Sequence, residues 1–372
     1  MSRIIDGDGH IVEPPDLWLN YAHSSFHDRV PTIARNADGI PTVKLEGKTR
    51  EGVVRSLYSS CVPAGLVDEE RMREIDFDAV PKGGWDPDAR IEVMDAEGIE
   101  SAFLYPSMAL GLGHLSDLDL ARECARAYND WLSDFCQPHP QRLYGIGMVP
   151  LQDVDGAIAE MRRVVRTKGM KCVFFRPNPY NGRRLNDPAY EPFWAAAEEL
   201  DCAIAIHGSF GSRMPTVCDD RYTDDFYQHM ICHPFEQQMC CMDIVCGGVL
   251  ERHPGLRVAF MEAGVGWLGY WLERMDGHFE AMPSFVPDLK KKPSEYFLEQ
   301  CFLSCDPDDQ TIAAMMEFGG DRTIIWGSDY PHYDCWFPGA VAELERNCER
   351  LSPSQRAQVL GENDARLYKV CT

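Results

Sequence analysis

The sequence predicts an α/β fold, a (β/α)8 TIM barrel with an insertion after its first strand. Short β-rich segments alternate with amphipathic helical patterns along most of the 372 residues, which is typical of a parallel sheet. Eight such units favour a closed barrel. An open doubly wound sheet is the competing fold, but no Gly-x-Gly-x-x-Gly pattern follows an early strand. The expected strands are residues 4–10, 101–106, 143–149, 170–176, 203–207, 256–262, 301–304 and 323–329.

The helical patterns between these strands are clearest at residues 118–136, 154–168, 190–200 and 308–318. Residues 20–88 interrupt the alternation, because they are rich in proline, glycine and charge and contain no clear helix. We interpret this segment as an insertion over the barrel mouth, either a lid or a surface for a partner. Nothing repeats at a fixed period, so residues 1–372 are expected to form a single barrel domain that carries this insertion.

The composition limits the classes of partner. Hydrophobic residues make up 45% and charged residues 26% of the chain, so a large core is available. The net charge of −23 argues against nucleic acid and against an anionic membrane surface, but it does not identify a substrate. None of the fifteen cysteines forms a Cys-x-x-Cys pair, and no apolar signal or membrane-spanning run is present. These features predict a cytoplasmic protein with mostly buried, reduced cysteines.

Four of the expected strands end in residues that bind metals. Asp8 and His10 lie two positions apart at the end of the first strand, so their side chains point to the same side. His207, Glu262 and Asp329 end three later strands. In a barrel, the carboxyl ends of the strands meet at the catalytic face. The pattern therefore predicts a metal site at the barrel mouth.

The types of ligand narrow the chemistry. Asp8, His10, His207 and Asp329 offer two nitrogens and two carboxylates, a set that suits zinc, manganese or iron(II). Such a metal activates water or polarises a substrate oxygen. Asp329 either binds the metal or accepts a proton. Arg176, at the end of the fourth strand, either clamps a substrate carboxylate or pairs with a carboxylate from a neighbouring strand.

Several further residues are candidates near this site. Glu13 follows His10 by three positions and either reaches the metal or caps a loop. His229 and His233 are one helical turn apart if residues 227–242 form a helix. Pro234 suits the first turn of a helix, however, which would leave His229 in the preceding loop and makes His233 the better ligand. Asp306 and His332 are outer candidates, and His332 could orient another ligand.

These strand ends resemble a known family. Asp8-Gly9-His10 is similar to the strand-one His-x-His or Glu-x-His motif of the amidohydrolase superfamily, in its amidohydrolase-2 branch of aminocarboxymuconate-semialdehyde decarboxylase relatives. His207 matches that branch's strand-five metal histidine. The strand-eight signature of that branch resembles Gly327-Ser328-Asp329-Tyr330-Pro331-His332. The segment before its strand six resembles Cys246-Gly247-Gly248-Val249-Leu250-Glu251-Arg252-His253-Pro254. The resemblance implies a metal-dependent decarboxylase or hydrolase.

The chain departs from the family at two strands. Asp8 stands where the family more often has His or Glu, and Glu262 stands where its decarboxylases carry a catalytic histidine. Glu262 could act as general acid if burial raises its pKa. Alternatively, Glu262, Glu13 and His233 could hold a second metal. That carboxylate-rich set resembles dinuclear iron or manganese oxygenases on the amidohydrolase fold.

Three functions remain open at this point. The first is a metal-dependent hydrolase or decarboxylase of a small carboxylated molecule, with Asp329 or Glu262 moving the proton and Arg176 orienting the substrate. The second is a dinuclear hydroxylase. The third is a non-catalytic subunit beside an active paralogue. A homo-oligomer or a pairing with a paralogous subunit is expected, because barrels with exposed insertions often associate.

Overall fold

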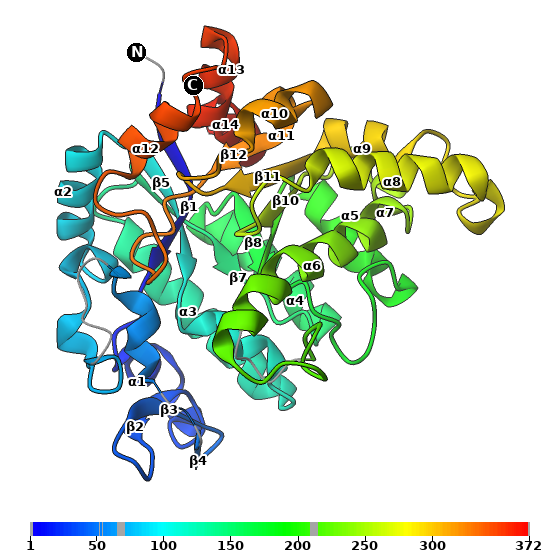
Figure 1. The fold of residues 1–372 in the computed structure, drawn as a ribbon. Helices are drawn as coiled ribbons and strands as arrows, with labels where there is room; N and C mark the ends of the chain where they lie inside the picture. The colour runs from blue at the N-terminus through cyan, green and yellow to red at the C-terminus, as the bar shows by residue number, and fades with distance from the viewer. Residues whose placement is uncertain (1–2, 52, 54, 65–70, 209–214, 371–372) are drawn as a thin grey trace.

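Parallel strands run through the centre of the molecule and helices surround them (Figure 1). This computed structural model describes residues 3–51, 53, 55–64, 71–208 and 215–370. The central strands follow the predicted ones closely, although residues 143–149 form two short strands instead of one. They are β1 (Ile5–Ile11), β5 (Ser101–Pro106), β6 (Leu143–Gly145), β7 (Gly147–Met148), β8 (Cys172–Phe175), β9 (Ala203–His207), β10 (Val258–Met261), β11 (Cys301–Cys305) and β12 (Ile324–Trp326).

The strands follow one another around the barrel in chain order. β1, β5 and β6 form one parallel ladder, and β7 to β12 form another. Ile146 joins the two, because its N–H donates to Leu104 O at 3.0 Å. After β12, the Asp329 N–H donates to Asp8 O at 2.9 Å, and the His10 N–H donates to Tyr330 O at 2.8 Å. These bonds link the last strand to the first, and the predicted (β/α)8 fold is confirmed.

The helices pack outside the strands. The long helix α3 begins after Asp117, whose carboxylate accepts the Leu120 N–H at 3.0 Å. Predicted helix 308–318 is shorter than expected, because the Asp309 side chain accepts the Thr311 N–H and holds a turn there. The helices are α1 (Leu17–Tyr21), α2 (Pro87–Glu97), α3 (Leu118–Cys136), α4 (Val154–Arg163), α5 (Glu191–Glu199), α6 (Asp225–Val245), α7 (Val249–Arg252), α8 (Leu268–Ala281), α9 (Pro293–Gln300), α10 (Ile312–Met315), α11 (Gly320–Thr323), α12 (Ala340–Asn347), α13 (Pro353–Ala357) and α14 (Asn363–Tyr368).

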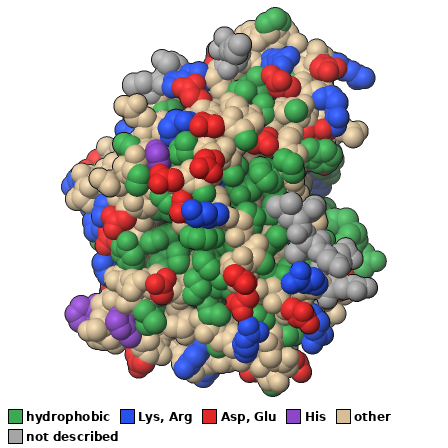
Figure 2. Space-filling model, turned by 90° about the vertical axis from the view of Figure 1, so that its left-hand side faces the viewer, with side chains coloured by type: hydrophobic (Ala, Val, Ile, Leu, Met, Phe, Trp, Pro, Cys, Tyr) green, Lys and Arg blue, Asp and Glu red, His purple; other side chains and the backbone are tan. Residues whose placement is uncertain are grey.

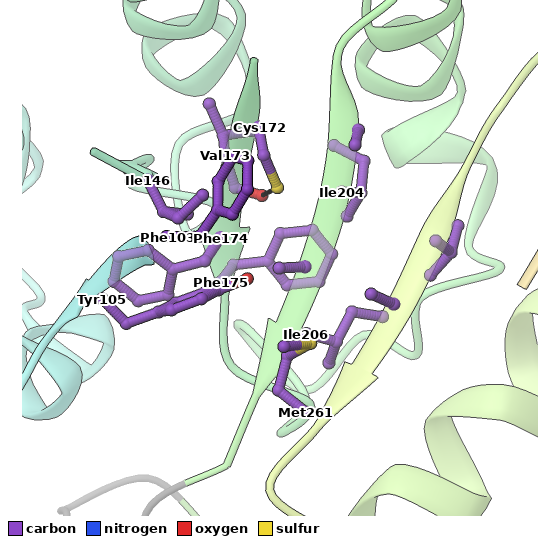
Figure 3. Close-up of a cluster of buried hydrophobic side chains, with 14 of the residues drawn as sticks. Phe103, Tyr105, Ile146, Cys172, Val173, Phe174, Phe175, Ile204, Ile206 and Met261 are labelled. Carbon is purple, nitrogen blue, oxygen red and sulfur yellow. Dashed lines mark hydrogen bonds between the residues drawn. The ribbon is translucent and has the colours of Figure 1, made fainter. Parts of the chain in front are cut away.

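Aromatic side chains fill the barrel below the strand ends. Phe103, Tyr105 and Phe174 gather with aliphatic residues of β8 and β9 in the cluster of Figure 3. Phe103 stacks on Tyr368 of α14 with ring centroids 3.6 Å apart. The Tyr105 ring lies 5.2 Å from the ring of His207. The apolar core therefore reaches directly to the residues predicted to bind metal.

The insertion contains a small sheet that the sequence did not reveal. β2 (Thr32–Arg35), β3 (Pro41–Leu45) and β4 (Lys48–Thr49) form an antiparallel meander. The turn from β3 to β4 uses Glu46 and Gly47, both with positive φ. Ser60 and Gly84 of the insertion pack at the barrel mouth, where the Tyr333 N–H donates to Ser60 O at 3.0 Å and the Val12 N–H to Gly84 O at 2.7 Å.

The surface mixes both signs of charge. Figure 2 shows Lys, Arg, Asp and Glu side chains scattered around an apolar centre, so this face carries no continuous acidic patch despite the net charge of −23. The cysteines that the structure describes are free, and most are buried. Within the described part of the chain, no helix has the length and apolarity needed to cross a membrane.

Candidate metal centre

Four predicted ligands meet at the carboxyl ends of β1, β9 and β12. His10 Nε2 lies 3.1 Å from His207 Nε2 and 3.4 Å from Asp329 Oδ1. Asp8 Oδ1 lies 3.4 Å from His207 Nε2 and 3.7 Å from His10 Nε2. All four side chains are buried. Residues separated by more than 300 positions in the chain thus face a common point.

Two backbone carbonyls fix the tautomers of the histidines. His10 Nδ1 donates to Pro106 O at 2.8 Å, and His207 Nδ1 donates to Gly208 O at 2.8 Å. Because a carbonyl only accepts, each Nδ1 carries a proton, and a neutral ring then presents a lone pair at Nε2. Two lone pairs that face each other at 3.1 Å repel, unless a cation or a shared proton lies between them. Histidine ligands of metals are oriented in this way.

The spacing of the donor atoms fits a bound cation. Metal bonds of about 2.0–2.2 Å place neighbouring ligand atoms roughly 3.0–3.6 Å apart. Three of the four separations above lie in this range, and the fourth is 3.7 Å. Asp8 Oδ1 and Asp329 Oδ1 are buried, and neither accepts a well-oriented hydrogen bond from a described group. These two oxygens and two nitrogens can hold one divalent metal ion.

Burial sets the charges of the ligands in the metal-free protein. Burial raises the pKa of Asp8, and burial together with the negative charge of Glu262 raises the pKa of Asp329 well above its usual value. Burial, then the neighbouring His332 and His207, lowers the pKa of His10 well below its usual value. The imidazole of His10 is therefore neutral, which is the form that binds a metal. A cation would restore both carboxylates to the ionised form.

A buried ion pair braces the strands that carry these ligands. Arg90 donates to His10 O at 2.7 Å and to Tyr330 O at 3.3 Å, and its guanidinium lies 3.8 Å from the Asp6 carboxylate. Asp6 also accepts from Ser328, through the backbone N–H at 2.9 Å and the hydroxyl at 2.6 Å. This network ties the end of β1 to the segment after β12, and so it fixes the distance between His10 and Asp329.

The comparisons with known proteins place this architecture in a family. The amidohydrolase-2 family model, described as Amidohydrolase, matches residues 5–370. The chain belongs to this amidohydrolase family. The resemblance inferred from the strand-end motifs is thereby confirmed.

Relatives and solved structures of the amidohydrolase family agree with this assignment. The chain is 26% identical to a 2-amino-3-carboxymuconate-6-semialdehyde decarboxylase of Dictyostelium discoideum, over 82% of this chain and 81% of the relative. A crystal structure of an amidohydrolase from Mycobacterium avium subsp. paratuberculosis is 22% identical with a TM-score of 0.81, covering 100% and 99% of the two chains. A dihydroxybenzoic acid decarboxylase of Polaromonas sp. JS666, solved with manganese and the inhibitor 2-nitroresorcinol, is 21% identical with a TM-score of 0.70, covering 99% and 97%.

Glu262 does not have the protonation state expected of a general acid in this amidohydrolase. Its carboxylate lies 3.4 Å from His233 Nε2 and 3.6 Å from His207 Nδ1. Burial alone would raise the pKa of Glu262, but His233 and His207 lower it well below its usual value. The condition on which Glu262 could act as general acid, a raised pKa, is therefore not met. Glu262 is ionised and partners His233, whose pKa Glu262 raises against the effect of burial.

Helix α6 places both candidate histidines at the site. It begins at Asp225, so Pro234 lies inside the helix and His229 belongs to it. The prediction that Pro234 starts the helix and leaves His229 in a loop is wrong. The ring centroids of His229 and His233 are 4.4 Å apart. A proline in the first turn and a proline inside a helix look alike in sequence, because tertiary packing decides which is tolerated.

Glu13 acts as a loop anchor. Its carboxylate accepts the backbone N–H groups of Met108 at 2.9 Å, Ala109 at 2.8 Å and, more weakly, Ser107 at 3.4 Å. Of its two expected roles, the geometry supports the cap and not the metal ligand. Because Ser107–Ala109 follow β5, Glu13 shapes the rim of the mouth.

Arg176 is buried beside a small cavity. Its Nε donates to Asn178 Oδ1 at 3.0 Å and its Nη1 approaches Leu110 O at 3.5 Å. The cavity is lined by Arg176 together with Leu110, Phe174 and Tyr180, among others. Its Nε and Nη1 groups thus contact neutral acceptors beside this cavity, an arrangement that suits a binding group for a carboxylate.

His332 lies closer to the centre than its sequence position indicated. Its ring packs against that of His10, tilted by 34° with centroids 3.9 Å apart, and its Nδ1 lies 2.6 Å from Asp329 Oδ1. Its Nε2 is hydrogen-bonded to Ser107 Oγ at 2.9 Å. Asp306, the other outer candidate, has its pKa raised to about 8 by burial and by Glu262. In the sequence, the spacing of three residues between Asp329 and His332 was the signal that could have indicated this contact.

Two of these residues hold unusual backbone conformations. Glu262 has φ of 51° and Asp329 has φ of 52°, in the left-handed region that non-glycine residues rarely adopt. Glu262 follows β10 directly, and Asp329 lies three residues after the end of β12. Such strain persists only where the surrounding structure enforces it, and it is typical of functional sites.

Proposed function

We propose that this protein is a metal-dependent decarboxylase that acts on a small carboxylated molecule. The observation that carries the proposal is the pair of facing Nε2 atoms of His10 and His207, 3.1 Å apart with both Nδ1 atoms bound to carbonyls. The decarboxylase names of the relative and of the manganese-bound neighbour support this reaction. Manganese is the favoured metal, and zinc or iron(II) suits the same ligands.

Asp8, His10, His207 and Asp329 would hold the metal, which would supply positive charge to a substrate oxygen. Arg176 orients the substrate carboxylate through its guanidinium. When the bond between carbon and carboxylate breaks, carbon dioxide leaves and the electron pair stays on the substrate carbon. A proton must then reach that carbon.

Asp329 is the proton-transfer group that the geometry supports best. Burial and the negative charge of Glu262 raise the pKa of Asp329, whereas His233 and His207 lower the pKa of Glu262 despite its burial, so Asp329 takes up a proton more readily than Glu262 does. His332 and Ser107 continue the chain of polar groups away from Asp329, with separations of 2.6 and 2.9 Å. That chain gives Asp329 a route by which to exchange its proton.

Decarboxylation is preferred over the other activities for two reasons. The relatives described above support it and give no support to hydrolysis or to dioxygen chemistry. The complete set of buried ligands also argues against a purely structural subunit. The carboxylated aromatic named for the Polaromonas enzyme suggests that hydroxybenzoates are the first substrates to test.

The test combines metal content with release of carbon dioxide. Chelated protein is reloaded with Mn²⁺, Zn²⁺ or Fe²⁺ and assayed on a panel of hydroxybenzoates. We expect release of carbon dioxide to depend on the metal. His207→Ala should lose the metal, whereas the control His23→Ala, at an exposed histidine, should keep it. Full metal occupancy in His207→Ala would show that the ligand assignment is wrong.

A further inference from the structure

A second group of metal-binding side chains lies beside the first. His229 and His233 of α6 and Glu262 after β10 each offer a ligand atom, and these atoms all lie within 4.8 Å of one another. We propose that these three residues form a second site for a first-row divalent cation. The proposal stands on geometry separate from that of the decarboxylase site and does not depend on the reaction.

Helix α6 is fixed against the two strands that border this site. The Gln237 amide, buried one turn beyond His233, donates to Ile206 O at 2.7 Å and to Met261 O at 3.1 Å. These carbonyls belong to the residues directly before His207 and Glu262. The register of α6 relative to β9 and β10 is therefore set by hydrogen bonds, and His233 reaches Glu262 because of it.

The orientation of His233 is also fixed. Its Nδ1 donates to His229 O at 3.1 Å, which leaves Nε2 pointing to Glu262 Oε2 at 3.4 Å. A Cβ atom added at Gly208 would lie 2.8 Å from His233 Cδ2, so this glycine makes room for the ring. The distance of 3.4 Å between His233 Nε2 and Glu262 Oε2 is the same as that between His10 and Asp329 and that between His207 and Asp8 at the first site.

Two imidazoles and one carboxylate define the chemistry of the ligand. A set of two His and one carboxylate with open positions suits Fe(II), and imidazole with carboxylate also suits Mn(II) and Zn(II). Two histidines four residues apart on one helix face present both nitrogens to one ion. The half-exposed Asp334 lies with Oδ2 3.3 Å from His229 Nε2 and could complete the site from the solvent side.

The two sites share a wall and not a ligand. Glu262 Oε2 approaches His207 at Nδ1, at 3.6 Å, and that nitrogen is bonded to Gly208 O. The other ring nitrogen, Nε2, faces Asp8 and His10. The His207 ring thus separates the sites. The competing interpretation is that Glu262 and His233 form a simple buried ion pair, which predicts one bound metal.

The experiment counts Mn²⁺ bound to the full-length chain. After chelation and reloading with Mn²⁺, elemental analysis and low-temperature electron paramagnetic resonance measure stoichiometry and coupling between ions. We expect two equivalents in the wild type and one in both His229→Ala and Glu262→Gln. The variant His207→Ala should lose the first ion and keep the second. The matched control His278→Ala, an exposed histidine of α8, should keep two.

The outcomes separate the two proposals. The second site would be overturned if the wild type bound one equivalent of Mn²⁺, or if His229→Ala and Glu262→Gln both bound two. Either result would leave the decarboxylase site untouched. Loss of both ions from His207→Ala would mean that the second group binds no ion alone, which also overturns it. Thermal denaturation of each variant establishes that the fold is kept. Glu262→Gln is the conservative variant for this test, because the amide keeps the shape of the side chain.

Discussion

The ion pair beneath the metal ligands should contribute strongly to stability. Arg90 is 1% exposed, and its partner Asp6 is also 1% exposed. In Arg90→Met, Asp6 loses its cation, and His10 O and Tyr330 O each lose a donor. Removing one member of a buried pair costs about 3–5 kcal/mol. A chain of this length unfolds with an entropy of roughly 0.8 kcal/mol per kelvin, so we expect Tm to fall by about 4–6 °C.

Differential scanning calorimetry measures this change. The control is Arg35→Met, which breaks a salt bridge to Asp76 between half-exposed side chains. An exposed pair is worth about 0–1 kcal/mol, so its Tm should move by roughly 1 °C or less. Arg90→Met should also weaken Mn²⁺ binding, because the carbonyl groups that Arg90 holds belong to His10 and to the residue after Asp329. A Tm for Arg90→Met within about 1 °C of the control would refute the bracing role.

Two further predictions concern Gly327, which follows β12, and Asp364 of α14. Gly327→Ala should lower the free energy of unfolding by about 1–3 kcal/mol and weaken Mn²⁺ binding, because the new Cβ would contact Asp8 Cβ and lie 2.9 Å from Asp8 O; calorimetry and metal titration check this, with Gly277→Ala as the uncrowded control. Burial, then Asp6, raises the pKa of Asp364 well above its usual value. The native state therefore binds this proton more tightly, and stability from Asp364 is present at acid pH and lost as pH rises from the unfolded toward the folded pKa. In Asp364→Asn this pH-dependent loss of unfolding free energy, up to about 1.4 kcal/mol per pH unit in this window, should be absent. Urea denaturation of both proteins between pH 4 and 8 checks this, and parallel plots of unfolding free energy against pH for wild type and variant would contradict it.

Much of the fold and the first ligand group could be predicted from local sequence. Local sequence places Asp8, His10, His207 and Asp329 at or near the carboxyl ends of strands, and such ends converge on one face of a barrel. The membership of His229 in α6 depends instead on packing around Pro234. The role of Glu13 depends on the loop after β5, which is 94 or more residues away in the chain.

The protonation state of Glu262 could not be predicted from its position on a strand. A carboxylate in a buried site has a raised pKa when it stands alone and a lowered pKa when an imidazolium faces it. The contact that decides this is with His233, which comes from a helix whose register is set by Gln237. Long-range geometry therefore determines whether Glu262 donates a proton or holds a charge.

The balance of buried charge argues for a cation at the first site. Asp6 faces Arg90, and three backbone N–H groups satisfy Glu13, so both carboxylates have compensation. Asp8 and Asp329 instead face imidazoles, Asp8 that of His207 at 3.4 Å and Asp329 that of His332 at 2.6 Å, and their Oδ1 atoms lack well-oriented donors among the described groups. Two buried carboxylates that no arginine or lysine faces cost several kcal/mol unless they are protonated or bind a cation. A divalent ion matches their combined charge, whereas two protons would leave the facing lone pairs of His10 and His207 without a shared partner.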